Sequence, residues 1–134
     1  MKAINSLVIT PFDVSKQDVY DTIIKALSEV GIDVYRPHEL LTGDLIVNTI
    51  TDAIRKADVI FVDISRQNPN VFYELGIAHA LRKPTLLLMS SDANTNLPTD
   101  LQGFFYFVYN PKDLSNLSDY VKKSVKKYLH RKGA

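Results

Sequence analysis

Residues 57–80 have the sequence ADVIFVDISRQNPNVFYELGIAHA and carry the clearest structural signal in the chain. Residues 59–64 are almost continuously apolar and rich in β-branched side chains, as expected for a strand buried on both faces of a parallel sheet. Asn68 and Pro69 then form a favourable helix start, with asparagine as the N-cap and proline at the first helical position. The stretch therefore predicts a buried strand, a polar turn and a helix that contains a single acid, Glu74.

The rest of the chain continues this alternation of strand-length and helix-period segments, which is typical of a parallel sheet with crossover helices. Five strands and five helices fit an α/β, flavodoxin-like doubly wound domain with strand order 2-1-3-4-5 and helices on both faces. We expect residues 1–134 to form one such domain, in which Gly31 ends the first helix. The pattern locates strands at residues 4–10, 32–35, 59–64, 85–89 and 104–109, and helices at residues 16–30, 44–56, 68–83 and 113–130.

Composition excludes several classes of function. The formal net charge of the 134 residues is +1, which argues against nucleic-acid binding through a broad basic face. The chain has no cysteine, so disulfides, thiolate catalysis and zinc–cysteine sites are excluded. No apolar run approaches the ~20 residues that span a bilayer, and the first residues enter a strand pattern without a signal-peptide core. We therefore expect a cytoplasmic protein with no membrane, metal or cofactor.

A site is expected beyond the carboxyl ends of the strands, because ligands of open α/β sheets bind where the strand order reverses. With order 2-1-3-4-5, that crevice lies between the first and third strands. The loop after the second strand, with His38 and Glu39, reaches the same end and could close over a substrate, although an ordinary solvated loop is the better explanation of these two residues. The residues that we expect to bind substrate there are Thr10, Phe12, Asp13, Arg36, Asp63, Asn68 and Asn70, with Ser65 and Glu74 in the same crevice.

Glu74 is the candidate catalytic residue. On a helical wheel its neighbours are mostly apolar, so its side chain is expected on a packed or cleft-facing side. Burial would raise the pKa of its carboxyl group, whereas the nearby helix N-terminus would lower it, and the sequence leaves the outcome open. The alternative is a structural acid that pairs with His79, Arg82 or a partner subunit.

Three other features have ordinary structural explanations. His79 lies about 140° round the wheel from Glu74 and is interpreted as a bonded interior or interface histidine. The aromatic residues 104–107 fit a buried strand. The basic run 122–127, followed by Arg131 and Lys132, falls on the outer face of an amphipathic helix. We interpret it as solvated surface, with contact to phosphate or another protein as the alternative.

The strand ADVIFVDI, the helix start NPNVFYELGIAHA and the following Lys83-Pro84 together resemble the nucleoside 2-deoxyribosyltransferase superfamily. The similarity is greatest to its short nucleotide-binding, TIR-like members. Thr10-Pro11-Phe12 before the first helix and Gly43 before the second also match. The resemblance extends from about residue 4 to residue 89, and its specific part is the Tyr73–Gly76 segment with the preceding asparagine–proline–asparagine.

The resemblance implies attack at the anomeric carbon of a deoxynucleoside, a nucleoside monophosphate or NAD. Glu74 matches the family's catalytic glutamate, which forms a covalent glycosyl intermediate or stabilises an oxocarbenium-like transition state. Asp63 and Asn68 correspond to polar positions that hold the sugar or base, and Phe12 matches a first-loop position near the substrate. A homo-oligomer is also implied, because transferases of this type take site residues from a neighbouring subunit.

One departure from the family bears on the substrate. Classical transferases have acidic residues in the loop before the helix, where this chain has Asn68 and Asn70. The chain thus lacks an obvious proton donor for a departing base, which favours NAD or a similar pyridinium nucleotide because nicotinamide leaves as a neutral molecule. The same asparagines support an alternative, a non-catalytic nucleotide-sensing or self-associating module. A purely structural interaction domain is a third interpretation.

Overall fold

The computed structural model describes residues 4–11, 16–35, 46–66, 68–93 and 106–131, apart from the side chains of 46–49 and 128–131. These residues form a five-stranded, all-parallel sheet with strand order β2-β1-β3-β4-β5, so the predicted fold class and strand order are confirmed. In chain order the elements are β1 (Asn5–Ile9), α1 (Gln17–Glu29), β2 (Asp33–Tyr35), α2 (Ile46–Lys56), β3 (Val59–Asp63), α3 (Pro69–Ala80), β4 (Thr85–Ser90), β5 (Tyr106–Tyr109) and α4 (Ser115–Arg131).

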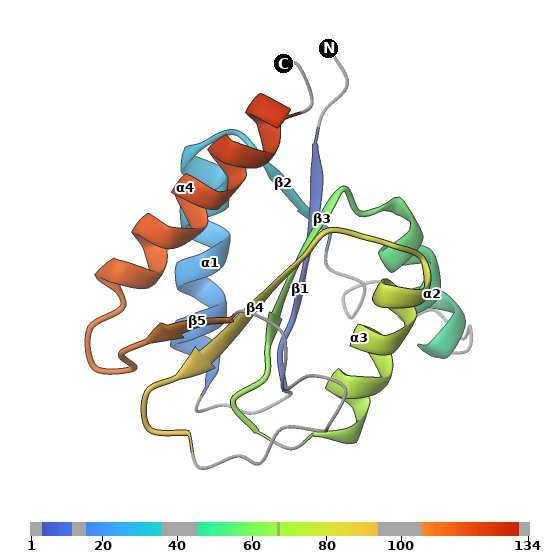
Figure 1. Ribbon diagram of the computed structural model, residues 1–134, viewed down its shortest axis with the longest axis horizontal. Helices are drawn as coiled ribbons and strands as arrows, with labels where there is room; N and C mark the ends of the chain where they lie inside the picture. Colours follow the sequence, from blue (N-terminus) through green and yellow to red (C-terminus); the bar gives the residue numbers. More distant parts are fainter. Residues whose placement is uncertain (1–3, 12–15, 36–45, 67, 94–105, 132–134) are drawn as a thin grey trace.

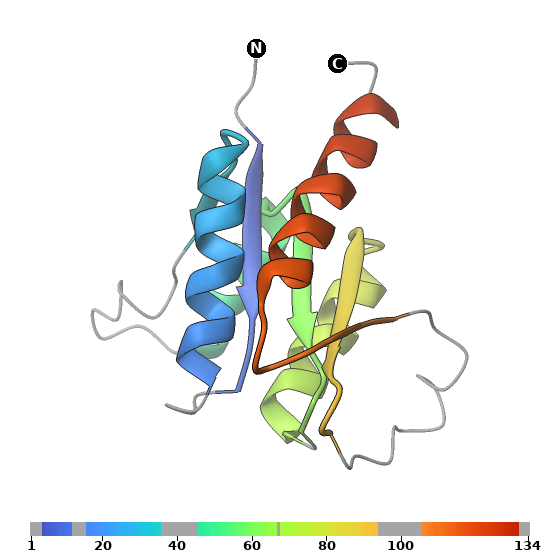
Figure 2. The same ribbon diagram turned by 90° about the vertical axis from the view of Figure 1, so that its left-hand side faces the viewer.

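Helices cover both faces of the sheet, as Figure 1 shows, with α1 and α4 on one face and α2 and α3 on the other. Figure 2 presents the layer of α1 and α4 in front of the strands. Each face has its own apolar core. The core under α2 and α3 includes Ile54, Ile60 and Leu75, whereas the core under α1 and α4 includes Ile23 and Phe61.

Strand β3 lies at the centre of the sheet and all five of its residues are buried. Its side chains alternate between the two cores, so Val59 and Phe61 pack under α1 and α4 while Ile60 and Val62 pack under α2 and α3. The continuous apolar run in the sequence follows from this double burial. The prediction that this strand is buried on both faces is therefore confirmed.

Two expectations about the elements need correction. The described residues contain four helices and not five, and none of them lies between β4 and β5, where residues 94–105 fall outside the description. The aromatic strand β5 is only half buried, because it is the edge strand and no described helix covers its second face. Phe107 stacks on Tyr120 of α4, whereas Tyr106 and Val108 on the other face are 42% and 50% exposed.

Two helices of the chain end in the same backbone motif. After α1, Gly31 has φ +78° and the amide of Ile32 donates to the carbonyl of Leu27. After α3, Arg82 has φ +55° and the amide of Lys83 donates to the carbonyl of Ala78. Both are left-handed C-terminal caps, and the prediction that Gly31 ends its helix is confirmed. Among the described residues, no helix has both the length and the apolar character that crossing a membrane requires.

Candidate active site

The candidate site begins with the cap of α3 at the carboxyl edge of the sheet. The side-chain Oδ1 of Asn68 accepts hydrogen bonds from the backbone amides of Asn70 and Val71, at 2.9 and 3.2 Å. Pro69 occupies the first position of the helix, where its missing N–H costs nothing. The sequence-based prediction of this cap is confirmed. The cap fixes the first residue of α3 and therefore the position of Glu74 along the helix.

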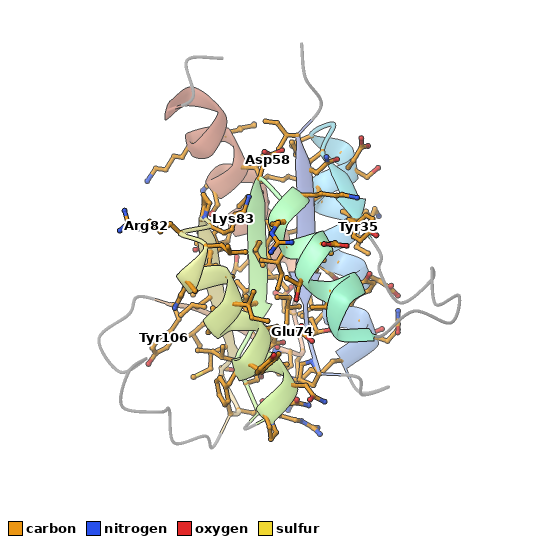
Figure 3. All side chains as sticks on the ribbon, turned by 90° about the vertical axis from the view of Figure 1, so that its right-hand side faces the viewer. Tyr35, Asp58, Glu74, Arg82, Lys83 and Tyr106 are labelled. Atoms are coloured by element: carbon orange, nitrogen blue, oxygen red, sulfur yellow. The ribbon has the colours of Figure 1, made fainter. Side chains whose placement is uncertain are left out.

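Glu74 lies in the second turn of α3, on the flank that faces α2. On the opposite flank, about 140° round the helix, His79 makes a contact of 3.3 Å to Thr85 at the start of β4. Between the two flanks, Val71, Leu75 and Ala78 are buried against the sheet. Figure 3 shows Glu74 where α3 lies next to α2.

The environment of Glu74 raises the pKa of an otherwise ordinary carboxyl group. Its side chain is half buried, and desolvation raises its pKa from 4.5 to about 7. Desolvation by burial is the cause of this upward shift, whose direction the sequence alone left open. A carboxyl group with this pKa exchanges its proton near neutral pH, a property that is common among catalytic acids, bases and nucleophiles.

Glu74 makes no hydrogen bond or ion pair within the described part of the chain. Within the described residues, Glu74 is therefore not paired with His79 or Arg82, as the structural alternative would require. His79 is half buried and contacts Thr85, as expected for a bonded interior histidine. Arg82 lies at the far end of α3 from Glu74 and is exposed (Figure 3).

The other predicted site residues fall into two groups. Thr10 directly follows β1 and is half buried, and continuing the pairing of Ile9 with Val62 by one residue places it alongside Asp63. Asn70 is exposed in the first turn of α3. The remaining candidates lie outside the described residues, namely Phe12, Asp13, Arg36, His38 and Glu39.

Asp63 is fully buried and lies on the sheet face opposite to Glu74. Its alternation with Val59 and Phe61 directs its side chain toward the α1 and α4 layer. Oδ1 accepts the backbone amide of Ser65 at 2.9 Å, and Oδ2 accepts the hydroxyl of Tyr109 at 2.6 Å. Asp63 and Glu74 thus share one edge of the sheet but project from opposite faces.

Asp63 belongs to a buried polar network that sequence reasoning did not assemble. The Lys16 ammonium group donates to the Tyr109 hydroxyl at 3.2 Å, and the Ser65 hydroxyl lies 3.3 Å from the same oxygen. The backbone amide of Ser90 donates to the Ser65 hydroxyl at 2.7 Å. Burial and the neighbouring Asp63 carboxylate raise the pKa of Tyr109, so its hydroxyl stays protonated and donates. The network joins the ends of β3, β4 and β5 to the start of α1.

No local signal in the sequence identifies this network. Tyr109 is 46 residues from Asp63 and 93 from Lys16, and each lies in a segment with an unremarkable pattern. The sequence placed only Asp63 and Ser65 at the carboxyl edge of the sheet, because they lie at the end of a buried strand. Within the described residues there is no group of three or more histidines and acids arranged to hold a metal ion.

The chain matches no protein-family model and no curated protein. Several solved structures share its fold. They include the Clostridium botulinum CMP N-glycosidase BcmB, with 22% identity, a TM-score of 0.64, and coverage of 87% of this chain and 98% of that chain. The TIR domain of the Toll-related receptor TRR-2 from Hydra magnipapillata has 18% identity and a TM-score of 0.65, over 87% and 97% of the chains.

A third structure is the 2-deoxyribosyltransferase from Bacillus psychrosaccharolyticus, with 16% identity, a TM-score of 0.63, and coverage of 87% and 91%. At these identities the likeness is one of fold. The expected resemblance is confirmed at that level. The chain has the flavodoxin-like fold that nucleoside deoxyribosyltransferases, a CMP N-glycosidase and TIR domains have in common.

Proposed function

We propose that this protein breaks the N-glycosidic bond of a nucleoside or nucleotide, with Glu74 as the nucleophile. The observation that carries the proposal is a lone, half-buried carboxyl group with a pKa of about 7, unpaired among the described residues, on the helix that begins at the carboxyl edge of the sheet. The fold shared with a CMP N-glycosidase and a 2-deoxyribosyltransferase supports the same chemistry.

In the proposed reaction the Glu74 carboxylate attacks the anomeric carbon of the sugar. A bond forms between Oε and C1′ while the bond from C1′ to the base nitrogen breaks, and its electron pair leaves with the base. Water then displaces the carboxylate to give a hydrolase, or a second base displaces it to give a transferase. The desolvated position of Glu74 favours this step, because attack relieves a carboxylate that burial has destabilised.

The composition around Glu74 favours a leaving base that needs no proton. Between Asp63 and Asp92 the sequence has no other carboxylate, and Asn68 uses its Oδ1 to cap α3. A pyridinium base such as the nicotinamide of NAD departs as a neutral molecule. A neutral purine or pyrimidine would need a donor from elsewhere. We therefore place NAD and related pyridinium nucleotides first among the proposed substrates.

The substrate contacts proposed from the sequence are Thr10, Phe12, Asp13, Arg36, Asp63, Asn68 and Asn70. Among these, Asp63 has both carboxylate oxygens engaged by protein donors. Its proposed contribution is therefore to hold the end of β3 in place beside the sugar or base. Asn70, exposed in the first turn of α3, has a side chain accessible to a ligand.

The test is a chromatographic screen for free base, in which the wild-type protein is incubated with deoxynucleosides, nucleoside monophosphates and NAD. The proposal predicts release of base from at least one member, and most rapidly from NAD. No release from any of them, at protein concentrations that exceed trace contamination, would contradict it.

The second candidate is a nucleotide-binding module that does not cleave its ligand. The likeness to TIR domains, with a TM-score of 0.65 for the Hydra receptor domain, favours it alongside the missing proton donor. Calorimetry separates the two candidates. Heat of nucleotide binding without released base over many hours identifies the module, whereas binding followed by base release identifies the enzyme.

A further inference from the structure

Asn70 lies one helical turn before Glu74 on the same flank of α3. Residues four apart on a helix differ by about 40° around its axis, with about 5–6 Å between their Cβ atoms. Asn70 therefore shares with Glu74 the flank next to α2 (Figure 3), and it is nearer to the carboxyl edge of the sheet, where α3 begins. Because helical side chains lean toward the N-terminus of their helix, the carboxyl group of Glu74 is directed toward the turn that contains Asn70.

The side chain of Asn70 is available to a ligand. It is exposed, and within the residues that the structure describes its carboxamide has no hydrogen-bond partner. The cap of α3 engages only its backbone amide, which donates to Oδ1 of Asn68 at 2.9 Å. The cap thus holds the main chain of Asn70 in place and leaves the carboxamide uncommitted.

Helix stability does not explain an asparagine at this position. Asparagine is a weaker helix former than alanine, leucine or glutamate. The first turn of α3 contains no acid, although the helix macrodipole would favour a carboxylate there. A carboxylate at position 70 would also repel the carboxylate of Glu74 one turn later. An amide in its place offers hydrogen bonds beside Glu74 without adding charge.

The stereochemistry of the proposed reaction determines which part of the substrate meets Asn70. In natural nucleosides the base projects from one face of the sugar ring, and the 2′-hydroxyl group of a riboside projects from the other. A nucleophile that displaces the base attacks C1′ from the face opposite to it. The 2′-hydroxyl group, on the carbon next to C1′, is therefore on the side of the ring that faces α3, whereas the base points away.

We propose that Asn70 binds the 2′-hydroxyl group of the sugar and makes the protein selective for ribosides over 2′-deoxyribosides. A carboxamide has an oxygen that accepts and an NH₂ group that donates, and a hydroxyl group can use either. Hydrogen bonds to this hydroxyl group strengthen in the transition state of glycoside cleavage. The inference rests on the proposed function and names its substrate class, the ribosides, to which NAD belongs.

Base release from two matched pairs of substrates tests the inference, CMP with dCMP and nicotinamide mononucleotide with its 2′-deoxy form. Asn70→Ala should lower kcat/KM about three- to tenfold on the ribosides, the loss expected for one neutral hydrogen bond. On the 2′-deoxy forms it should change kcat/KM by less than about twofold, because they have no group for Asn70 to bind. Comparing each pair in wild type and variant cancels the different chemical lability of the two bonds.

Asn116→Ala is the matched control. Asn116 is an exposed asparagine at the second residue of α4, as Asn70 is at the second residue of α3, and α4 lies on the opposite face of the sheet. This variant should leave kcat/KM unchanged for both members of each pair. In Asn70→Ala, equal losses on riboside and 2′-deoxyriboside, or no loss on either, would overturn the inference.

Calorimetry separates this inference from the proposed function. The Glu74→Gln protein binds substrate without attacking it, so the affinities for CMP and dCMP are measured in this background with and without Asn70→Ala. The added substitution should weaken CMP binding several-fold and leave dCMP binding unchanged. An unchanged ratio of the two affinities, or no binding of either nucleotide, overturns the inference. Absence of base release in the kinetic assay contradicts the proposed function, and the calorimetric ratio then decides the role of Asn70.

Discussion

At the scale of single residues, Glu74 is set apart by its desolvation. Its carboxyl group is flanked by apolar side chains of α3, and no described residue offers it a hydrogen bond or a positive charge. A group in this setting is costly to ionise and is therefore reactive once ionised. Two consequences can be measured, one in the pH dependence of activity and the other in the pH dependence of stability.

The activity of a Glu74 nucleophile requires its ionised form. For base release we expect kcat/KM to rise about tenfold per pH unit below pH 7 and to level off above it, because this ratio reports the pKa of the free protein. A profile that instead falls above pH 7 would make Glu74 a general acid. Initial rates between pH 5 and pH 9 provide the measurement.

The stability of the folded protein should depend on the same group. The folded pKa of about 7 lies above the ordinary value of 4.5, so the folded state holds a proton that the unfolded state has lost. The free energy of unfolding should therefore fall as pH rises from about 4.5 to about 7. Glu74→Gln removes this loss, and after allowance for partial solvent screening it should be about 1–2 kcal/mol more stable than wild type at pH 8.

Urea denaturation at pH 5 and pH 8 measures the difference. Glu29→Gln is the matched control, because Glu29 is exposed and its pKa is lowered by the hydrogen bond from Lys122. It should show no gain in stability relative to wild type between the two pH values. An equal effect of Glu74→Gln at both pH values would show that the carboxyl group of Glu74 is solvated in the folded protein.

At the scale of elements, α3 combines a strong start with a strained end. Asn68 caps its N-terminus, whereas its C-terminal cap places Arg82 in the left-handed region that costs a non-glycine residue about 1–2 kcal/mol. The equivalent position after α1 is Gly31, which adopts φ +78° without this cost. The two caps therefore allow the energetic cost of a left-handed backbone to be compared between a glycine and a non-glycine residue in one protein.

Exchanging the residue types should move stability in opposite directions. Arg82→Gly should raise the free energy of unfolding by about 0.5–1 kcal/mol, because the left-handed conformation then carries no Cβ strain. Gly31→Ala should lower it by about 1 kcal/mol for the converse reason, even though no atom lies within 4 Å of the added methyl group. Thermal or urea unfolding measures both. A loss of stability in Arg82→Gly would mean that the arginine side chain contributes more than its backbone costs.

The start of α3 offers a second test at this scale. Asn68→Ala should lower the free energy of unfolding by about 1 kcal/mol, since two backbone amides lose their acceptor. Asn68→Asp should retain the cap and therefore the stability. Loss of stability in both variants alike would show that the amide nitrogen of Asn68, and not its capping oxygen, is what the fold requires.

At the scale of the whole molecule, the buried network around Tyr109 links the strand ends at the carboxyl edge of the sheet. The network bonds residues of β3, β4 and β5 to Lys16, which directly precedes α1, and it holds the strand end that precedes the loop to α3. Because its groups are buried, a missing partner leaves a desolvated donor or acceptor, which costs more than a hydrogen bond at the surface.

Removing the hydroxyl of Tyr109 should therefore destabilise the molecule. We expect Tyr109→Phe to lower the free energy of unfolding by about 1–3 kcal/mol, because Asp63 loses one of its two donors and Lys16 loses its acceptor. Tyr106→Phe on the same strand is the control and should change little, since Tyr106 is 42% exposed. Equal effects of the two substitutions in urea denaturation would contradict a structural role for the network.

Local patterns predicted most of this architecture. The apolar run of β3, the cap at Asn68 and the stop at Gly31 are each decided by neighbouring residues, and the alternation of strands and helices predicts the parallel sheet. The half-exposed β5 was not predicted, because an aromatic strand has the same pattern at an edge as at the centre of a sheet. The pairing of Asp63 with Tyr109 joins residues 46 apart and depends on the folded chain.

The candidate site likewise has features that the local sequence predicts and features that depend on the folded chain. Glu74 was identified from its apolar neighbours on one helix, which a helical wheel reveals. Whether burial or the helix N-terminus controls its pKa depends on how closely α3 packs on the sheet, and this the sequence does not contain. The opposite orientation of Asp63 follows from which core each β3 residue enters, since strand residues alternate between faces.

The central claim is that Glu74 carries the bond-breaking step, and the most direct measurement compares Glu74→Gln with Glu29→Gln in the release of base from the best substrate of the panel. Both changes replace a carboxylate by an amide of the same shape, at a half-buried and an exposed position respectively. We predict that Glu74→Gln loses activity by roughly 10³-fold or more, while Glu29→Gln stays within about twofold of wild type. Base release by Glu74→Gln at the wild-type rate would contradict the account.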